Sequence, residues 1–202
     1  HDGKQLSPAV YQVVTAAQFW NAPVEILVAG SNTNTVAKQA AAITGVARVI
    51  QAEAAHLAHQ LAEDVANIIV QVAGDYQVIL AAHSSFSRNI VPRAAALLDV
   101  AMISDVLEIK ADHTYVRSVY AGDILTTIQS IDALQIVTIH SSNFTAAKNT
   151  KSNNTDVNNT GAQAEIVSIE VPEPFTITRW VSETRSLSDR PALTSAKVVI
   201  TG

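Results

Sequence analysis

The strongest constraint on the fold is the alternation of short apolar runs with amphipathic helical patterns in the first half of the chain. Val24–Ala29, Arg48–Ile50 and Tyr76–Ala82 have the length and composition of strands buried on both faces of a sheet. Helical patterns separate these runs. Strands that alternate with helices pair in parallel through right-handed crossovers. The sequence therefore predicts an α/β fold with a mostly parallel sheet flanked by helices on both faces.

Four helices are predicted from apolar residues at steps of three and four. They are Val10–Ala17, Thr35–Thr44, Leu57–Val72 and Ile90–Leu98. Ser7 and Pro8 are typical of the start of the first helix, and Gly45 and Gly74 of the ends of the second and third. Pro92 is acceptable only near the start of the fourth, because an interior proline removes a helical hydrogen bond.

The second half of the chain predicts antiparallel hairpin additions to the sheet, because β-branched runs are separated by turn residues at Ala111-Asp112 and Gly122-Asp123. The expected strands are Val106–Ile109, Tyr115–Tyr120, Ile124–Ile128, Gln135–Ile139 and Ile166–Val171. Lys148–Gln163 is almost entirely polar, so it has too little apolar area to offset the entropy of ordering. We expect a mobile surface loop there.

Composition excludes several classes of function. The net charge is -5 and no Lys/Arg cluster occurs, which argues against nucleic acid as a partner. The chain has no cysteine, so disulfides, thiolate nucleophiles and iron-sulfur ligation are excluded. No apolar run reaches the roughly 20 residues needed to cross a bilayer, so we expect a soluble domain without membrane insertion.

Three residue patterns suggest sites, and each has a simpler structural interpretation. Ser84–Asn89 follows a predicted strand and begins a helix, where hydroxyls and free amides can hold an anion; the alternative is helix capping. His56, His59 and Glu63 have a spacing that could bind a metal on one helix face, but a solvated polar face is the favoured explanation, because no other residues supply a metal-site context. We predict no metal site.

A hydrolytic site is the third possibility. His83 ends a predicted strand beside serines, and Asp105 could complete a Ser-His-Asp arrangement. The Gly-x-Ser-x-Gly motif that exposes a nucleophilic serine is absent, so we predict no catalytic residue.

Several motifs occur in a family-like order and spacing. They are Val24–Gly30, Asn89–Leu97, Ile103–Val106, Tyr115–Gly122, Ser188–Thr194 and Ala196–Ile200. Together they closely resemble the amino-terminal domain of the alpha subunit of electron-transfer flavoproteins. In that family a Gly-Arg-Gly segment of the flavin domain comes next, and a short apolar strand precedes a segment like His1–Gly3. Asp123 stands where Asn is commoner in the family.

The resemblance implies an adenine-nucleotide-hydrolase-like α/β domain over residues 1–184. Residues 185–202 would be a connector and the first strand of a FAD domain. FAD would then belong to the full-length protein, with no flavin expected in this part. The flavin contacts are expected after Gly202, so no cofactor-binding residue is assigned within the 202 residues.

The resemblance also implies a heterodimer with a beta subunit. It would carry electrons from acyl-CoA and related dehydrogenases to a membrane quinone reductase. This chain would be a non-catalytic scaffold, cytoplasmic in bacteria or in the mitochondrial matrix of eukaryotes.

Two other functions remain open at this point. One is a free-standing adenine-nucleotide-binding module of the stress-protein type, and the other is a dimerisation platform of an unrelated flavoprotein. The charged residues inside the family-like motifs have an expected structural or interface role, because arginine can hold loops at a domain boundary. They are Arg93, Asp105, Arg117, Asp189 and Arg190.

Overall fold

The computed structural model describes residues 1–149, 163–184, 196 and 198–200. Asp189 and Arg190, most of the predicted polar loop 148–163 and most of the predicted connector 185–202 lie outside the described residues. Residues 198–200 are described and belong to no strand. The domain boundary at 184 therefore stays a prediction.

Gly202, after which the flavin contacts are expected, also lies outside the described residues. The structure thus gives no test of where those contacts begin. Their position after Gly202 stays a prediction from the family resemblance.

A parallel sheet forms the first part of the core. Its order is β1-β2-β8, and the strands are β1 (Val24–Gly30), β2 (Val46–Glu53) and β8 (Glu165–Ile169). Helix α2 (Asn34–Ala41) buries Val36 and Ala40 against one face of this sheet. Leu57 and Ile68 cover the other face. The predicted burial of β1 and β2 on both faces is confirmed.

A mixed sheet forms the second part. Its order is β3-β7-β4-β5-β6, and the strands are β3 (Val78–Ala82), β7 (Gln135–Ile139), β4 (Met102–Ala111), β5 (Thr114–Val119) and β6 (Ile124–Gln129). β7 runs parallel to both β3 and β4, whereas β4, β5 and β6 are successively antiparallel. The prediction of hairpin additions in the second half is confirmed.

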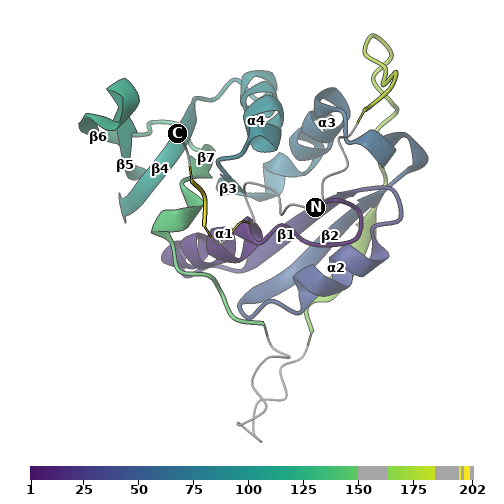
Figure 1. The fold of residues 1–202 in the computed structure, drawn as a ribbon, viewed down its shortest axis with the longest axis horizontal. Helices are drawn as coiled ribbons and strands as arrows, with labels where there is room; N and C mark the ends of the chain where they lie inside the picture. The colour runs from purple at the N-terminus through teal and green to yellow at the C-terminus, as the bar shows by residue number, and fades with distance from the viewer. Residues whose placement is uncertain (150–162, 185–195, 197, 201–202) are drawn as a thin grey trace, which may run out of the picture.

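The remaining helices cover the mixed sheet. Helix α1 (Ala9–Ala17) packs Ala16 against the core of β4, β5 and β7, and α4 (Ser85–Leu97) packs Val91 and Ala95 against Ile136 of β7. Helix α3 (Ala62–Val72) packs against α4. These two helices lie on one side of the strands, and α1 and α2 lie on the other side (Figure 1). The α/β fold with helices on both faces is confirmed.

Short 3₁₀ segments complete the described elements. They are η1 (Gln18–Trp20), η2 (Ala55–His59), η3 (Ala73–Asp75), η4 (Tyr120–Gly122) and η5 (Ser141–Asn143). No helix in the described ranges has the length and apolar character needed to span a membrane.

The strands form two sheets rather than the one that the sequence predicted. β1 and β3 share no ladder, so each has an unpaired edge in the described structure. Side chains link them: the hydroxyl of Tyr76, just before β3, donates to the Glu25 carboxylate of β1, and Arg48 lies 2.8 Å from the same carboxylate. Burial, together with the bond to Glu25, raises the pKa of Tyr76 to about 12.

Two helix predictions need correction. The helix expected over Leu57–Val72 is interrupted at Gln60, which has a left-handed backbone (φ 48°). The Gln60 amide donates to the Ala29 carbonyl at the end of β1, and this tertiary contact replaces a helical turn. Helix α4 begins at Ser85, five residues earlier than predicted, so Pro92 lies in its interior. The early start comes from a capping box, in which Ser84 and Ser87 bond each other's backbone amides.

Candidate functional site

A β-bulge at Asp105 is the most unusual backbone feature near the end of β7. The register between β4 and β7 shifts between Ile103 and Val106, and Asp105 has a left-handed φ of 57°. Its amide donates to the Thr138 hydroxyl (3.1 Å) rather than to a ladder carbonyl. Aspartate tolerates this conformation better than most residues. Bulges often redirect a side chain, and here the Asp105 carboxylate lies 2.8 Å from Nδ1 of His140.

Thr138 connects this bulge to the end of β3. Its hydroxyl oxygen lies 3.0 Å from Nδ1 of His83, the residue that follows β3. Thr138 is fully buried, and His83 is half-buried. When the Thr138 hydroxyl donates to Nδ1, the neutral His83 ring carries its proton on Nε2 and can donate it elsewhere.

An open pocket of about 350 Å³ lies beside these residues. Its lining is His83, Arg88, Pro92, Met102, Ser104, Asp105, Arg117 and Ser118. The pocket thus joins the end of β3, helix α4, the bulged part of β4, and β5. Two of the five predicted structural or interface residues, Asp105 and Arg117, meet here. A position at the carboxyl end of parallel strands is where ligands of open α/β sheets bind.

The two arginines of this pocket have no acidic partner within the described part of the chain. No hydrogen bond or ion pair holds the guanidinium of Arg88 or Arg117 there, and Nε of Arg117 is buried without a hydrogen-bond partner. Asp105 is the pocket's one carboxylate, and it pairs with His140. The pocket therefore presents unpaired donors of positive charge.

Arg93 lies elsewhere on α4 and does not line the pocket. Its guanidinium carbon is 5.0 Å from the centre of the Phe175 ring, a cation-π distance. The Phe175 amide donates to the buried Asp64 of α3 at 2.7 Å. These contacts are of the kind that a structural role would use, and the predicted role of Arg93 stays a prediction.

The serines at the start of α4 are engaged in capping. Ser84 and Ser87 bond each other, and the Ser87 hydroxyl also donates to the Ala82 carbonyl. From the Ser84–Asn89 segment, Arg88 is the residue that reaches the pocket. The capping alternative therefore describes the serines, and whether this segment binds an anion stays open.

The arrangement suggested for His56, His59 and Glu63 does not form on one helix. The left-handed Gln60 separates the two histidines of η2 from Glu63 of α3. His59 instead stacks on Trp180, with ring centres 3.8 Å apart, and Glu63 accepts a hydrogen bond from the Thr178 hydroxyl (2.9 Å). Among the residues that the structure describes, no group of His, Cys, Asp and Glu is placed to hold a metal ion.

A second concavity, about 180 Å³, lies near the carboxyl end of β1 and includes His1, Gln60 and the stacked His59 and Trp180 in its lining. The polar groups of His1 and Gln60 bond each other and the Ala29 carbonyl. They are therefore less available to a ligand than the arginines of the larger pocket.

Thr138 and His140 are site residues that sequence reasoning missed. Both lie at the carboxyl end of the correctly predicted strand 135–139. Their position there is the sequence feature that could have identified them as site residues. The Ser-His-Asp arrangement that was considered and not predicted does not form between His83 and Asp105, because His83 bonds Thr138 and Asp105 pairs with His140.

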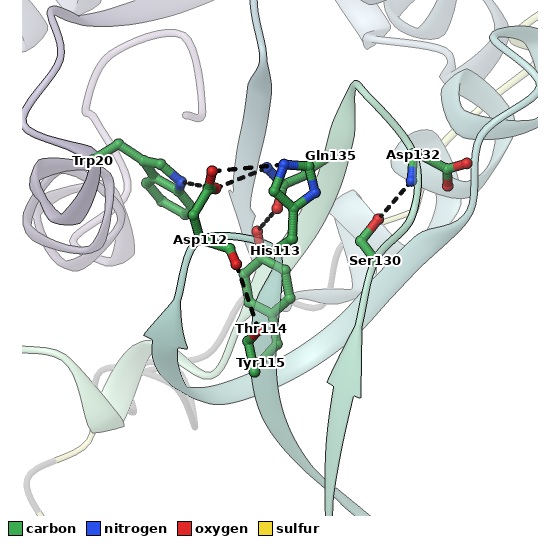
Figure 2. Close-up of polar contacts among 8 residues, drawn as sticks. All are labelled: Trp20, Asp112, His113, Thr114, Tyr115, Ser130, Asp132 and Gln135. Carbon is green, nitrogen blue, oxygen red and sulfur yellow. Dashed lines mark hydrogen bonds and ion pairs between the residues drawn. The ribbon is translucent and has the colours of Figure 1, made fainter.

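Gln135, at the opposite end of β7, belongs to a polar network (Figure 2). Its amide donates to Asp112 (3.2 Å), and the buried Tyr115 hydroxyl donates to its carbonyl oxygen. The Trp20 indole also donates to Asp112, at 2.9 Å. Hydrogen bonds from Trp20 and then Gln135 hold the pKa of Asp112 below its ordinary value, and burial raises the pKa of Tyr115.

Comparison with known proteins identifies the family. A family model described as the electron transfer flavoprotein domain matches residues 1–174, most of the 202-residue chain. The chain belongs to the electron transfer flavoprotein family. The resemblance to the alpha subunit is confirmed by individual relatives as well.

The electron transfer flavoprotein subunit alpha of Pseudomonas aeruginosa is 35% identical over 202 residues, covering 100% of this chain and 62% of that protein. The subunit alpha of Bradyrhizobium diazoefficiens is 38% identical, with 100% and 61% covered. A Caenorhabditis elegans relative, named a probable mitochondrial electron transfer flavoprotein subunit alpha, is 33% identical, with 100% and 58% covered. The chain thus spans about three fifths of the length of these relatives.

Proposed function

We propose that this chain is the scaffold and beta-subunit-binding part of an electron-transfer flavoprotein alpha subunit. The observation that carries the proposal is the match of the whole chain to proteins named subunit alpha, at 33% to 38% identity in the three relatives above. The complete protein would accept electrons from acyl-CoA and related dehydrogenases and pass them to a quinone reductase. It would work in the cytoplasm of a bacterium or in the mitochondrial matrix of a eukaryote.

The residues described here do not fit FAD. A dinucleotide flavin needs a large, mostly apolar pocket. The two concavities are about 350 and 180 Å³ and are lined largely by polar side chains. No Gly-rich phosphate-binding fingerprint follows β1 or β3. In this proposal the chain is a non-catalytic part, and the flavin contacts of the complete alpha subunit lie after Gly202, as the family resemblance implies.

β1 and β3 each have an unpaired edge in the described structure. In this proposal, the short apolar strand that the family resemblance puts before His1 pairs along these edges. The His1 ring lies 3.0 Å from the Ala29 carbonyl at the carboxyl end of β1. A strand parallel to β1 that leads into His1 would therefore run along these edges, and it would cover two apolar strands that are otherwise exposed to pairing with other molecules. Amide exchange at β1 and β3 should slow in a protein that includes the preceding residues.

Co-expression with an electron-transfer flavoprotein beta subunit tests the proposed function. The two chains should co-elute in size-exclusion chromatography as a complex without visible flavin absorbance. Co-elution of a stoichiometric flavin with the chain alone would contradict the scaffold role. Failure to bind the beta subunit would contradict the partner assignment.

Nucleotide titration tests the alternative of a free-standing module. We expect no saturable micromolar binding of ATP or AMP, because the serines after β3 are used in capping and no Gly-rich loop is present. Micromolar binding would favour the stress-protein type of module over the scaffold. Membership of the electron transfer flavoprotein family favours the scaffold.

A further inference from the structure

The larger pocket gathers hydrogen-bond donors from separate elements around one space. Its donor-bearing side chains are His83, Arg88, Ser104, Arg117 and Ser118. They follow β3 or belong to α4, β4 and β5. Within the described residues, no side-chain hydrogen bond of Arg88, Ser104, Arg117 or Ser118 occupies these donors, and Nε2 of His83 is also unbonded.

The charge of the pocket favours an anion. Arg88 and Arg117 contribute two guanidinium charges, and Asp105 contributes one carboxylate. That carboxylate is engaged with Nδ1 of His140 at 2.8 Å rather than with either arginine. Nε of Arg117 is buried, and no residue that the structure describes bonds it. Leaving a buried charged donor unpaired is costly, and an oxyanion would remove that cost.

We propose that this pocket is a phosphate-binding site, with Arg117 and Arg88 as the main contacts and His83, Ser104 and Ser118 as further donors. Donors that approach from several elements match a tetrahedral oxyanion with at least three accepting oxygens better than a planar carboxylate.

The proposal does not depend on the proposed function. A scaffold domain can hold inorganic phosphate without being a nucleotide-binding module. The two conclusions are tested separately, because phosphate titration uses this chain alone and co-expression measures binding of the beta subunit.

The test is titration of the purified 202-residue chain with inorganic phosphate, followed by amide chemical shifts in ¹⁵N-labelled protein. We expect saturable shifts at Arg88, Asp105, Arg117 and Ser118, with a Kd on the order of millimolar, as for an exposed site with few charged contacts. Sodium chloride at the same ionic strength is the control and should not shift these amides in a saturable way. Absence of saturable shifts with phosphate would overturn the proposal.

Charge variants sharpen the test. Arg117→Gln should weaken phosphate binding about tenfold or more, because a charge-assisted contact is lost. Asp105→Asn should instead tighten it about two- to fivefold, since the competing carboxylate is removed and its shape kept. Arg179→Gln removes an exposed arginine outside the pocket and should leave the Kd unchanged. Equal effects of the Arg117 and Arg179 changes would mean non-specific attraction and would refute the site.

Acetate and AMP separate the possible sources of the oxyanion. Acetate should bind at least about tenfold more weakly than phosphate, because it offers fewer oxygens; equal binding would overturn the assignment to phosphate. Tighter binding of AMP than of phosphate would uphold the site and place the phosphate on a nucleotide, which would favour the module over the scaffold. Phosphate binding at least as tight as AMP binding would uphold both the site and the scaffold.

Discussion

The two ends of β7 carry polar side chains that are used in opposite ways. At the first residue, Gln135 is part of a closed network with Asp112, Tyr115 and Trp20. At the other end, Thr138 lies beside a pocket whose arginines have no partner in the described structure. One end satisfies its buried groups internally, and the other presents donors to a pocket.

The polar groups at the first end contribute to the stability of the fold, whereas those at the second end are available for binding. Gln135 and Tyr115 are 2% and 0% exposed, so their hydrogen bonds must be made within the protein. Arg88 is exposed and Arg117 is half-buried, and neither guanidinium bonds a described residue, so their pairing is left to a ligand or to water. Changes at the first end should therefore affect folding, and changes at the second end should affect binding.

The largest effect is expected for Gln135→Ala. It removes a buried side chain and leaves the Tyr115 hydroxyl without its acceptor, which should lower the free energy of unfolding by about 3 kcal/mol. Urea denaturation measures this loss. Tyr115→Phe is the matched control and should cost about 1 kcal/mol, because it removes one hydrogen bond and its donor from the Gln135 carbonyl oxygen but leaves no side-chain-sized cavity. A Gln135→Ala cost no greater than that of the control would show that the network is not closed.

An intermediate effect is expected at the bulge. Asp105→Ala and Asp105→Gly both remove the carboxylate that contacts His140, but only glycine adopts the left-handed backbone without strain. The alanine variant should therefore be about 1 kcal/mol less stable than the glycine variant in chemical denaturation. Equal stability would mean that the bulge relaxes when its side chain changes.

A small effect on folding is expected for Arg117→Gln. The guanidinium makes no hydrogen bond with a described residue, so the free energy of unfolding should change by less than about 0.5 kcal/mol. Thermal unfolding in phosphate-free buffer checks this value. A loss comparable to that of Gln135→Ala would show that Arg117 stabilises the fold and would remove the contrast between the two ends.

The smallest expected effect is the loss of the Asp112 contribution to stability at low pH. The pKa of Asp112 is held below its ordinary value by Trp20 and Gln135, so its contribution to stability is present above the ordinary aspartate pKa of 3.8 and is lost as the pH falls through the folded value. The stability difference between the wild type and Asp112→Asn should therefore narrow from pH 7 to pH 3. Denaturation at both pH values tests this, and an unchanged or wider difference would contradict it.

Much of the fold could be predicted because hydrophobic periodicity and turn residues indicate most of its helices and strands. The strand 135–139 matches the prediction at both ends, and the hairpin turns near Asp112 and Gly122 are confirmed. The interruption at Gln60 could not be predicted, because it depends on a bond to the distant Ala29 carbonyl. The apolar stripe correctly predicted that Leu57 is buried, although not that a 3₁₀ segment buries it.

The candidate site was predicted only in part. Asp105 and Arg117 stood out as charged residues inside family-like motifs, but nothing in the sequence spacing predicts that Arg88 lies beside them. The contacts depend on how β4, β5 and α4 meet at one end of the sheet. Pairing of His140 with Asp105 likewise depends on the bulge, which the local sequence does not signal.

The sequence by itself determined the α/β class, the order of most strands and helices, and membership of the electron transfer flavoprotein family, because periodicity and motifs are local properties of the chain. Only the tertiary structure decided that the strands of the described residues divide into two sheets, that Gln60 breaks a helix, and that the pocket arginines find no partner among the described residues. Each of these depends on groups far apart in sequence, whose hydrogen bonds are chosen by the packing of whole elements.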